Sequence, residues 1–141
     1  MKCLTVQQPW AWALVHGHWN TLVRCRQTSH RGLLLIHAAR DRDMLVAAGG
    51  NLPNGTPVPP SRDLAFGALI GWAHLIECVP SSRLPLAHSF PVRGPWCWLF
   101  DAPQFLPRPI PCVGGSHVWD LPEGLEESVR PLVEVSGLAE T

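Results

Sequence analysis

Residues 7–38 read QQPWAWALVHGHWNTLVRCRQTSHRGLLLIHA, and this stretch decides the fold. Gln8 is followed by Pro9, which suits the first position of a helix because the N–H that proline lacks has no partner there. Gly17 is the stop signal of this predicted helix. Further on, residues 33–38 are almost continuously apolar, as in a strand that is buried on both faces. Helix and strand signals therefore follow one another here without a linker.

The same stretch carries arginines on a predicted strand at residues 20–26. Successive side chains of a strand point to opposite faces, so Arg24 and Arg26 project to the same side. Arg31 follows at the start of the next strand, and none of the first 40 residues is acidic. Arginine binds phosphate through planar, bidentate contacts, whereas a salt bridge needs an acid within reach. We therefore predict that the three arginines form a phosphate or carboxylate site rather than surface salt bridges.

The rest of the chain alternates short strands, helices and irregular connections. Apolar residues, some interleaved with glycine, predict strands at residues 3–6, 65–79 and 96–100. Helical patterns predict further helices at residues 40–48 and 122–134. Runs rich in proline, glycine and asparagine predict connections at residues 49–61, 80–95 and 102–116. Helices mixed with antiparallel strands favour a single α+β domain.

An ordered series of short features runs through most of the chain: Gln8-Pro9-Trp10-Ala11, Gly17, Arg24, Arg31-Gly32, Ile36-His37-Ala38, Gly67 to Trp72 with Cys78-Val79, Gly94 to Trp98, and Gly114-Gly115 leading to Trp119. This series resembles the ASCH domain (activating signal cointegrator homology), a member of the PUA-like superfamily, over residues 2 to about 121. The resemblance implies a small β-barrel with flanking helices and a cleft for RNA, DNA or a nucleoside. For some members it also implies hydrolytic activity.

Two positions differ from the pattern of many relatives. Trp19 stands where they carry a lysine, and Leu22 stands where they carry a small or acidic residue. An indole supplies neither charge nor a basic amine, so we expect the chain to be a poor amidohydrolase for acylated nucleosides. A metal-independent ribonuclease or nucleoside amidohydrolase on the same cleft is the enzyme alternative. A cointegrator-type protein-interaction module is the second alternative.

The candidate cleft is predicted from seven residues, with phosphate held by Arg24, Arg26 and Arg31 and a base pocket shaped by Gln8, Trp12, Trp19 and His37. Trp12 and Trp19 flank the basic strand, where they could stack on a base or fill the core. His37 fits a hydrogen-bonded structural histidine better than a general base, and it is the weak catalytic candidate of the ribonuclease alternative. The predicted partner is RNA, single-stranded nucleic acid or a modified nucleoside.

Charge divides the chain unevenly, although its formal net charge is zero. Residues 1–119 carry ten basic and five acidic residues, a net charge of +5, whereas residues 120–141 carry one basic and six acidic residues, a net charge of −5. We therefore separate an ASCH-like domain at residues 1–121 from an acidic helix or tail at residues 122–141, packed on or trailing the same domain. The acidic segment fits a solvated helix face better than a segment that screens the basic site.

Cysteine and histidine spacing indicates neither a metal nor a disulfide framework. The five cysteines are odd in number and form no CxxC pair, which is typical of reduced cytosolic proteins. His16 and His18 straddle the end of a predicted helix without supporting ligands, so we predict no metal and no cofactor. No apolar run reaches the roughly 18 residues of a membrane span, and none resembles a signal sequence. We expect a soluble, cytoplasmic protein with no membrane partner.

Overall fold

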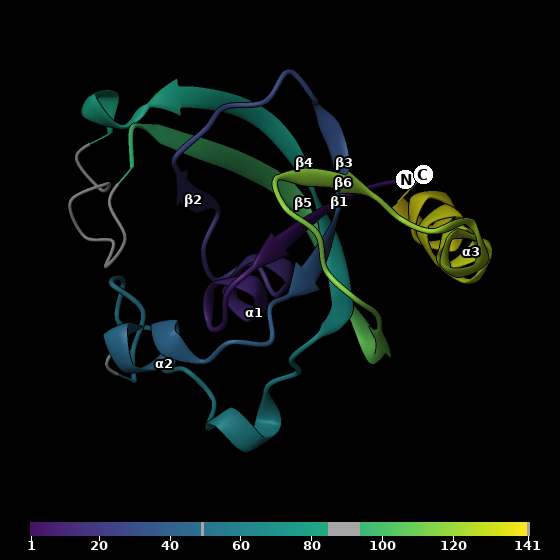
Figure 1. Cartoon of the computed structure of the whole chain (residues 1–141), viewed down its shortest axis with the longest axis horizontal. Coiled ribbons are helices and arrows are strands. Elements are labelled where there is room, and N and C mark those ends of the chain that lie inside the picture. Colours follow the sequence, from purple (N-terminus) through teal and green to yellow (C-terminus); the bar gives the residue numbers. More distant parts are fainter. Residues whose placement is uncertain (49, 85–93, 141) are drawn as a thin grey trace.

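The computed structural model describes residues 1–48, 50–84 and 94–140, and the six strands within these ranges form one mixed sheet. The strand order is β2-β5-β4-β3-β1-β6, in which β1 and β3 are parallel and all other neighbours are antiparallel. Figure 1 shows the sheet curving around α1, with α3 at its far end. In chain order, the elements are β1 (Lys2–Val6), α1 (Trp10–Val15), β2 (Thr21–Arg24), β3 (Gly32–Ala38), α2 (Asp43–Ala48), η1 (Ser61–Asp63), β4 (Ala68–Pro80), η2 (Ser81–Arg83), β5 (Trp96–Pro111), β6 (Val118–Asp120) and α3 (Glu123–Glu140).

This arrangement confirms a single small α+β domain. β2 and β6 lie at opposite ends of the strand order, and no backbone ladder joins them in the described part of the chain. The sheet is therefore curved but open, and its predicted closure into a barrel is not confirmed.

The curvature is concentrated in the long pair β4 and β5, whose register shifts at three places along the ladder. Gly71 lies between two of these shifts, where the β5 backbone comes very close. A Cβ atom at Gly71 would lie 2.1 Å from the Gln104 carbonyl oxygen and 2.9 Å from the Phe105 Cα. Glycine at this position therefore permits the close approach of the neighbouring strand.

The predicted proline-rich connection at residues 102–116 is wrong for most of its length, because β5 continues to Pro111. β2 pairs only with residues 96–99 of β5, so the remainder of β5 has a sheet neighbour on one side alone. An edge strand tolerates proline where its missing N–H would point away from the ladder. In the predicted connection at residues 80–95, η2 occupies Ser81–Arg83, while residues 85–93 lie outside the described residues.

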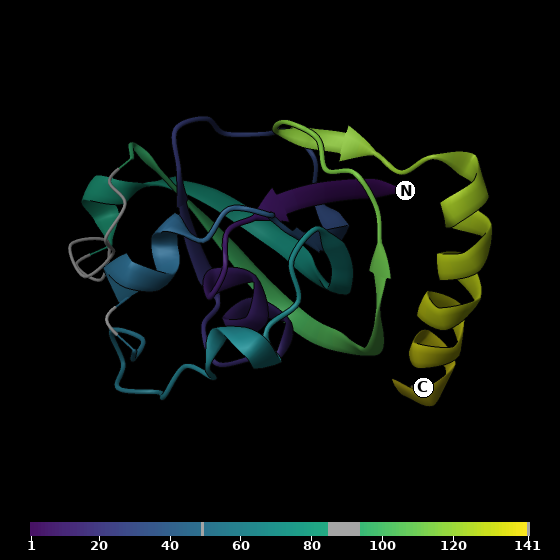
Figure 2. The same cartoon turned by 60° about the horizontal axis from the view of Figure 1, so that its bottom comes forward.

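Apolar side chains pack on both faces of the sheet. The larger cluster gathers α1 with the inner face, and Trp98, Leu14 and Ile36 are almost fully buried there. The smaller cluster lies on the opposite face under α3, where Val129 is fully buried. Figures 1 and 2 both place α3 beside β1 and β6 and away from β2, so its acidic residues do not cover Arg24 of β2.

Among the described residues, no helix combines the length and the apolar character that a membrane crossing requires.

Candidate nucleic-acid interface

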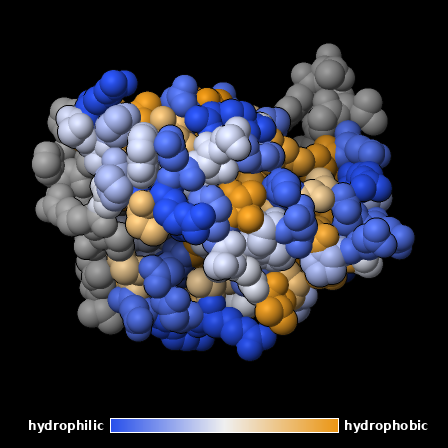
Figure 3. All heavy atoms as spheres, turned by 45° about the horizontal axis from the view of Figure 1, so that its top comes forward, coloured by the Kyte–Doolittle hydropathy of each residue, from blue (hydrophilic) through white to orange (hydrophobic). Residues whose placement is uncertain are grey.

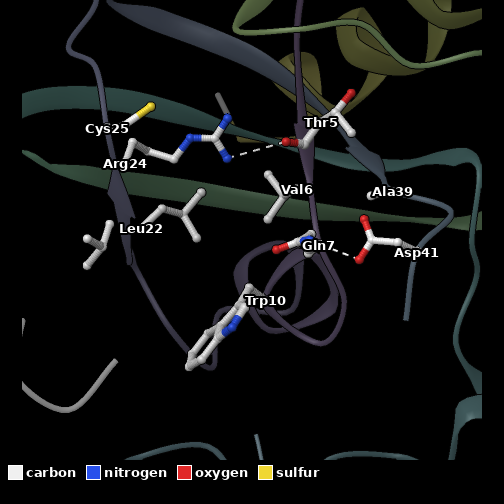
Figure 4. A pocket seen from close by; sticks show the side chains of 10 residues that line it. Thr5, Val6, Gln7, Trp10, Leu22, Arg24, Cys25, Ala39 and Asp41 are labelled. Carbon is white, nitrogen blue, oxygen red and sulfur yellow. Dashed lines mark hydrogen bonds between the residues drawn. The ribbon is translucent and has the colours of Figure 1, made fainter. Parts of the chain in front are cut away.

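An open pocket of about 400 Å³ lies between the end of β1, the start of α1 and β2. This volume is in the range of small-ligand sites. Figure 4 shows Arg24 entering from β2, with Gln7 and Asp41 on the other side of the pocket and Trp10 below. Apolar and polar side chains both line it, namely Thr5, Val6, Gln7, Trp10, Leu22, Val23, Arg24, Cys25, Ala39 and Asp41.

Arg24 is a half-buried cation at the mouth of this pocket. Its Nη1 donates a hydrogen bond to the Thr5 carbonyl oxygen at 3.4 Å, and its guanidinium lies 5.7 Å from the centre of the Trp98 ring. None of the ion pairs in the described part of the chain involves Arg24. Burial lowers the pKa of Arg24, because a half-buried guanidinium loses part of the water that would stabilise its charge. An anion at this position would compensate it.

Arg26 and His117 complete a group that we call the basic cluster, Arg24, Arg26 and His117. Trp98 supports it from below, because its Nε1 donates a 2.9 Å hydrogen bond to the Arg26 carbonyl oxygen and its ring meets the His117 ring edge-on at 5.8 Å. Burial first, and then the charges of Arg26 and Arg24, lower the pKa of His117. His117 also has a φ of 54°, a left-handed conformation that is uncommon for a residue with a side chain.

Arg31, the third predicted phosphate ligand, is engaged elsewhere. Its Nη2 lies 2.9 Å from a carboxylate oxygen of Glu77, and its Nη1 donates to the carbonyl oxygens of Thr28 and His30 at 2.6 and 2.9 Å. The hydrogen bond from Arg31 is the main reason that the pKa of Glu77 is lowered. The structure therefore brings Arg24 and Arg26 together and leaves Arg31 in the salt bridge that the sequence analysis disfavoured.

Gln8 supports the start of α1 rather than the pocket wall. Its side chain is almost fully buried, its Oε1 accepts a hydrogen bond from the Trp12 N–H, and its Nε2 donates to the Ala65 carbonyl oxygen, both at 2.9 Å. Both ends of the amide are thus used within the fold. The neighbouring Gln7, which the sequence analysis did not select, lines the pocket instead.

His37 lies behind the pocket wall and is 2% exposed. The Thr5 hydroxyl accepts a hydrogen bond from the Trp119 Nε1 at 3.1 Å and lies 3.3 Å from the His37 Nδ1. The His37 Nε2 lies 2.8 Å from the Cys112 carbonyl oxygen, which can only accept. The network thus assigns the proton to Nε2 and makes Nδ1 the acceptor of the Thr5 hydroxyl. His37 is hydrogen bonded within the fold, as the structural role required.

Burial lowers the pKa of His37, more than the hydrogen bond to Cys112 raises it. In the unfolded chain, His37 therefore binds a proton near its ordinary pKa of about 6.5. In the folded chain, the same imidazole is still neutral at that pH. We expect the free energy of unfolding to have its full value above that pH. Below it, the free energy of unfolding should decrease by at most about 1.4 kcal/mol per pH unit, the limit for one proton. Urea denaturation between pH 5 and 8 measures this, and His37→Gln should flatten the decline. An unchanged decline in His37→Gln would assign it to other histidines and contradict the expectation.

Neither predicted stacking residue lines the pocket. Trp12 lies on another side of α1, where its ring centre is 4.8 Å from that of His18. Trp19 is half-buried, packs against the larger apolar cluster and lies 5.9 Å from Trp10 by ring centres. Trp10, which the sequence analysis did not select, is the tryptophan that lines the pocket.

The sequence did not select five residues that lie in or beside the pocket and the basic cluster: Gln7, Trp10, Asp41, Trp98 and His117. The signals for Trp98 and His117 were weak, since an aromatic strand face and a histidine after two glycines are each compatible with a purely structural role. Asp41 carried a usable signal, because it is the first acid of the chain and follows a buried strand.

Comparisons with known proteins agree with this fold. No protein-family model matches the chain. The chain is 28% identical to activating signal cointegrator 1 from Homo sapiens and from Mus musculus over 138 residues, which covers 91% of the chain and 23% of each relative. It thus spans about a quarter of the length of these curated relatives.

Solved structures extend the comparison. The chain superposes on the crystal structure of ASCH from Zymomonas mobilis with a TM-score of 0.57 and 14% identity, covering 93% of this chain and 94% of that one. A point mutant of the same protein gives a TM-score of 0.59 over 93% and 96% of the two chains, also at 14% identity. Together with the sequence matches, these superpositions confirm the resemblance to the ASCH domain.

Proposed function

From the ASCH domain that this chain carries, we propose that it is a nucleic-acid-binding module whose pocket takes single-stranded RNA or a modified nucleoside. In this proposal the basic cluster holds phosphate and the pocket holds a base. ASCH homology supports an RNA-binding or related role in general, and the basic cluster supplies the specific chemistry.

The observation that carries the proposal is the state of Arg24. A half-buried guanidinium with one long hydrogen bond and a lowered pKa is short of negative charge, and it stands at the mouth of a pocket. Arg26 and His117 add positive or potentially positive groups beside it. Phosphate oxygens are charged acceptors that match arginine donors in geometry, and single-stranded nucleic acid presents them together with unstacked bases.

The pocket itself suits a base better than a catalytic step. Val6, Trp10 and Leu22 supply apolar surface against which a planar ring can pack. Leu22 is buried where many relatives carry a small or acidic residue, and it offers no group that moves a proton. Binding is therefore a better-supported proposal than hydrolysis at this pocket.

The salt dependence of RNA affinity tests the proposal. Two phosphate contacts, at Arg24 and Arg26, predict a log–log slope of affinity against salt of about −1.4, at roughly −0.7 for each contact with a single strand. Arg24→Ala and Arg26→Ala should each flatten the slope by about 0.7. Fluorescence anisotropy with a labelled single-stranded RNA across a salt series measures these slopes.

Arg31→Ala is the matched control, because it removes the same charge from an arginine that is already paired with Glu77. We expect the slope to be unchanged in this variant. If Arg31→Ala flattens the slope as much as Arg24→Ala does, the charge of the whole surface rather than the basic cluster would govern binding. RNA affinity that is indifferent to both Arg24 and Arg26 would remove the pocket from consideration.

A further inference from the structure

Gln7 and Asp41 form a polar pair on the side of the pocket opposite β2. Gln7 directly follows β1, and Asp41 lies three residues after β3. Because β1 and β3 are parallel neighbours, their carboxyl ends meet at the same edge of the sheet, which brings the two side chains together. Figure 4 shows them on the side of the pocket away from Arg24.

Asp41 fixes which way the Gln7 amide points. The Gln7 Nε2 donates a hydrogen bond of 2.8 Å to an oxygen of Asp41. An ionised carboxylate can only accept hydrogen bonds, so the amide must turn its NH₂ group toward it. The Gln7 Oε1 then points away from Asp41, and Figure 4 shows it directed into the pocket on the side of Leu22 and Trp10. The pair presents an acceptor backed by a negative charge.

We infer that this pocket selects nucleobases that carry an exocyclic amino group over uracil, with the Gln7 Oε1 as the reading atom and Asp41 as its positioning residue. The inference rests on the proposed function and specifies its ligand class. An amino group offers two N–H donors to the Gln7–Asp41 pair. Uracil has one N–H between two carbonyl oxygens. When uracil binds in the same position, a carbonyl oxygen faces the Gln7 Oε1 and the Asp41 carboxylate, and none of these groups can donate a hydrogen bond to the others.

Cytidine and uridine 5′-monophosphates are the sharpest probes, because they have the same ring size and the same phosphate. We expect cytidine monophosphate to bind about tenfold more tightly, since an acceptor that faces a carbonyl oxygen is left unsatisfied. Isothermal titration calorimetry gives both dissociation constants. The 4-N,N-dimethyl derivative of cytidine monophosphate, which lacks both N–H donors, should bind like the uridine compound.

Asp41→Asn tests the positioning role directly. An asparagine can donate as well as accept, so the Gln7 amide is no longer held with its oxygen toward the pocket. We expect the preference for cytidine over uridine to fall to within about twofold, because either amide orientation then becomes available. Asp43→Asn makes the same charge change on a nearby exposed residue that does not line the pocket, and it should keep the full preference.

Arg24→Ala separates this inference from the proposed function. It should weaken cytidine and uridine monophosphate alike and leave their ratio unchanged. Equal affinity of the two compounds, or preservation of the preference in Asp41→Asn, would overturn the inference. RNA binding with an Arg24-dependent salt slope would then leave the proposed function standing. If mononucleotides bind too weakly for calorimetry, competition of oligocytidylate against oligouridylate decides, and equal competition overturns the inference in the same way.

Discussion

Replacing Trp98 with alanine is expected to lower the free energy of unfolding by about 3–5 kcal/mol, the range for removing a fully buried large aromatic side chain. Trp98 has no exposed surface and packs in the larger apolar cluster. Its Nε1 also holds the Arg26 carbonyl oxygen, and its ring underlies Arg24 and His117. The substitution therefore removes both core volume and the support of the basic cluster. Urea or guanidinium denaturation followed by circular dichroism measures the loss.

Trp12→Ala is the matched control for this prediction. It deletes the same side chain from a partly exposed position outside the pocket, so the loss of stability should be clearly smaller. Trp98→Phe adds a second comparison, because it keeps an apolar ring while removing the donor to Arg26. A loss of stability in Trp98→Ala no greater than that in Trp12→Ala would contradict the assignment of Trp98 to the core.

Gly71→Ala is expected to cost about 3 kcal/mol or more, at or beyond the upper end of ordinary overpacking. The added Cβ would lie 2.1 Å from the Gln104 carbonyl oxygen, a backbone atom that cannot move without opening the β4–β5 ladder. A flexible side chain could give way, whereas the backbones of two hydrogen-bonded strands cannot move apart without breaking their ladder. A fall in the denaturation midpoint at an unchanged m-value would report this loss.

Gly124→Ala provides the contrast, because no atom outside the neighbouring residues and the local helix backbone lies within 4 Å of the Cβ that it would add. Gly124 is in the first turn of α3, where alanine has the higher helix propensity, so stability should be unchanged or slightly increased. Equal effects of the two substitutions would mean that the close approach at Gly71 does not govern stability.

Local signals predicted much of the fold. The Gln8-Pro9 start and the Gly17 stop bracket α1, and the apolar run at residues 33–38 lies within β3. The extension of β5 through Pro111 was missed because proline is a local breaker signal. Proline is tolerated in β5 where one edge of the strand has no neighbour, and this depends on how far β2 extends. That length is a property of the tertiary structure, which local sequence signals do not report.

The site was less predictable, because it depends on contacts between distant segments. Arg31 looked unpaired when only the first 40 residues were considered, yet the β3–β4 ladder sets Gly32 opposite Leu75 and so brings Glu77 to it. His117 reaches Arg24 across more than ninety residues of sequence. The resemblance to ASCH proteins indicated this region of the chain, and Arg24 lines the pocket there. Which of Gln7 and Gln8 lines the pocket depends on the path of the backbone, which the sequence alone does not show.

The pairing of β1 with β6 also determines when this protein can fold during synthesis. Lys2 lies opposite Asp120 and Cys3 opposite Trp119, so one edge of β1 stays open until nearly the whole sheet has been translated. At about 5–20 residues per second, a ribosome needs roughly 6–24 s between these positions. During that interval the nascent chain exposes an unpaired strand, the kind of edge that invites aggregation. Completion of the sheet consequently follows the translation of residue 120.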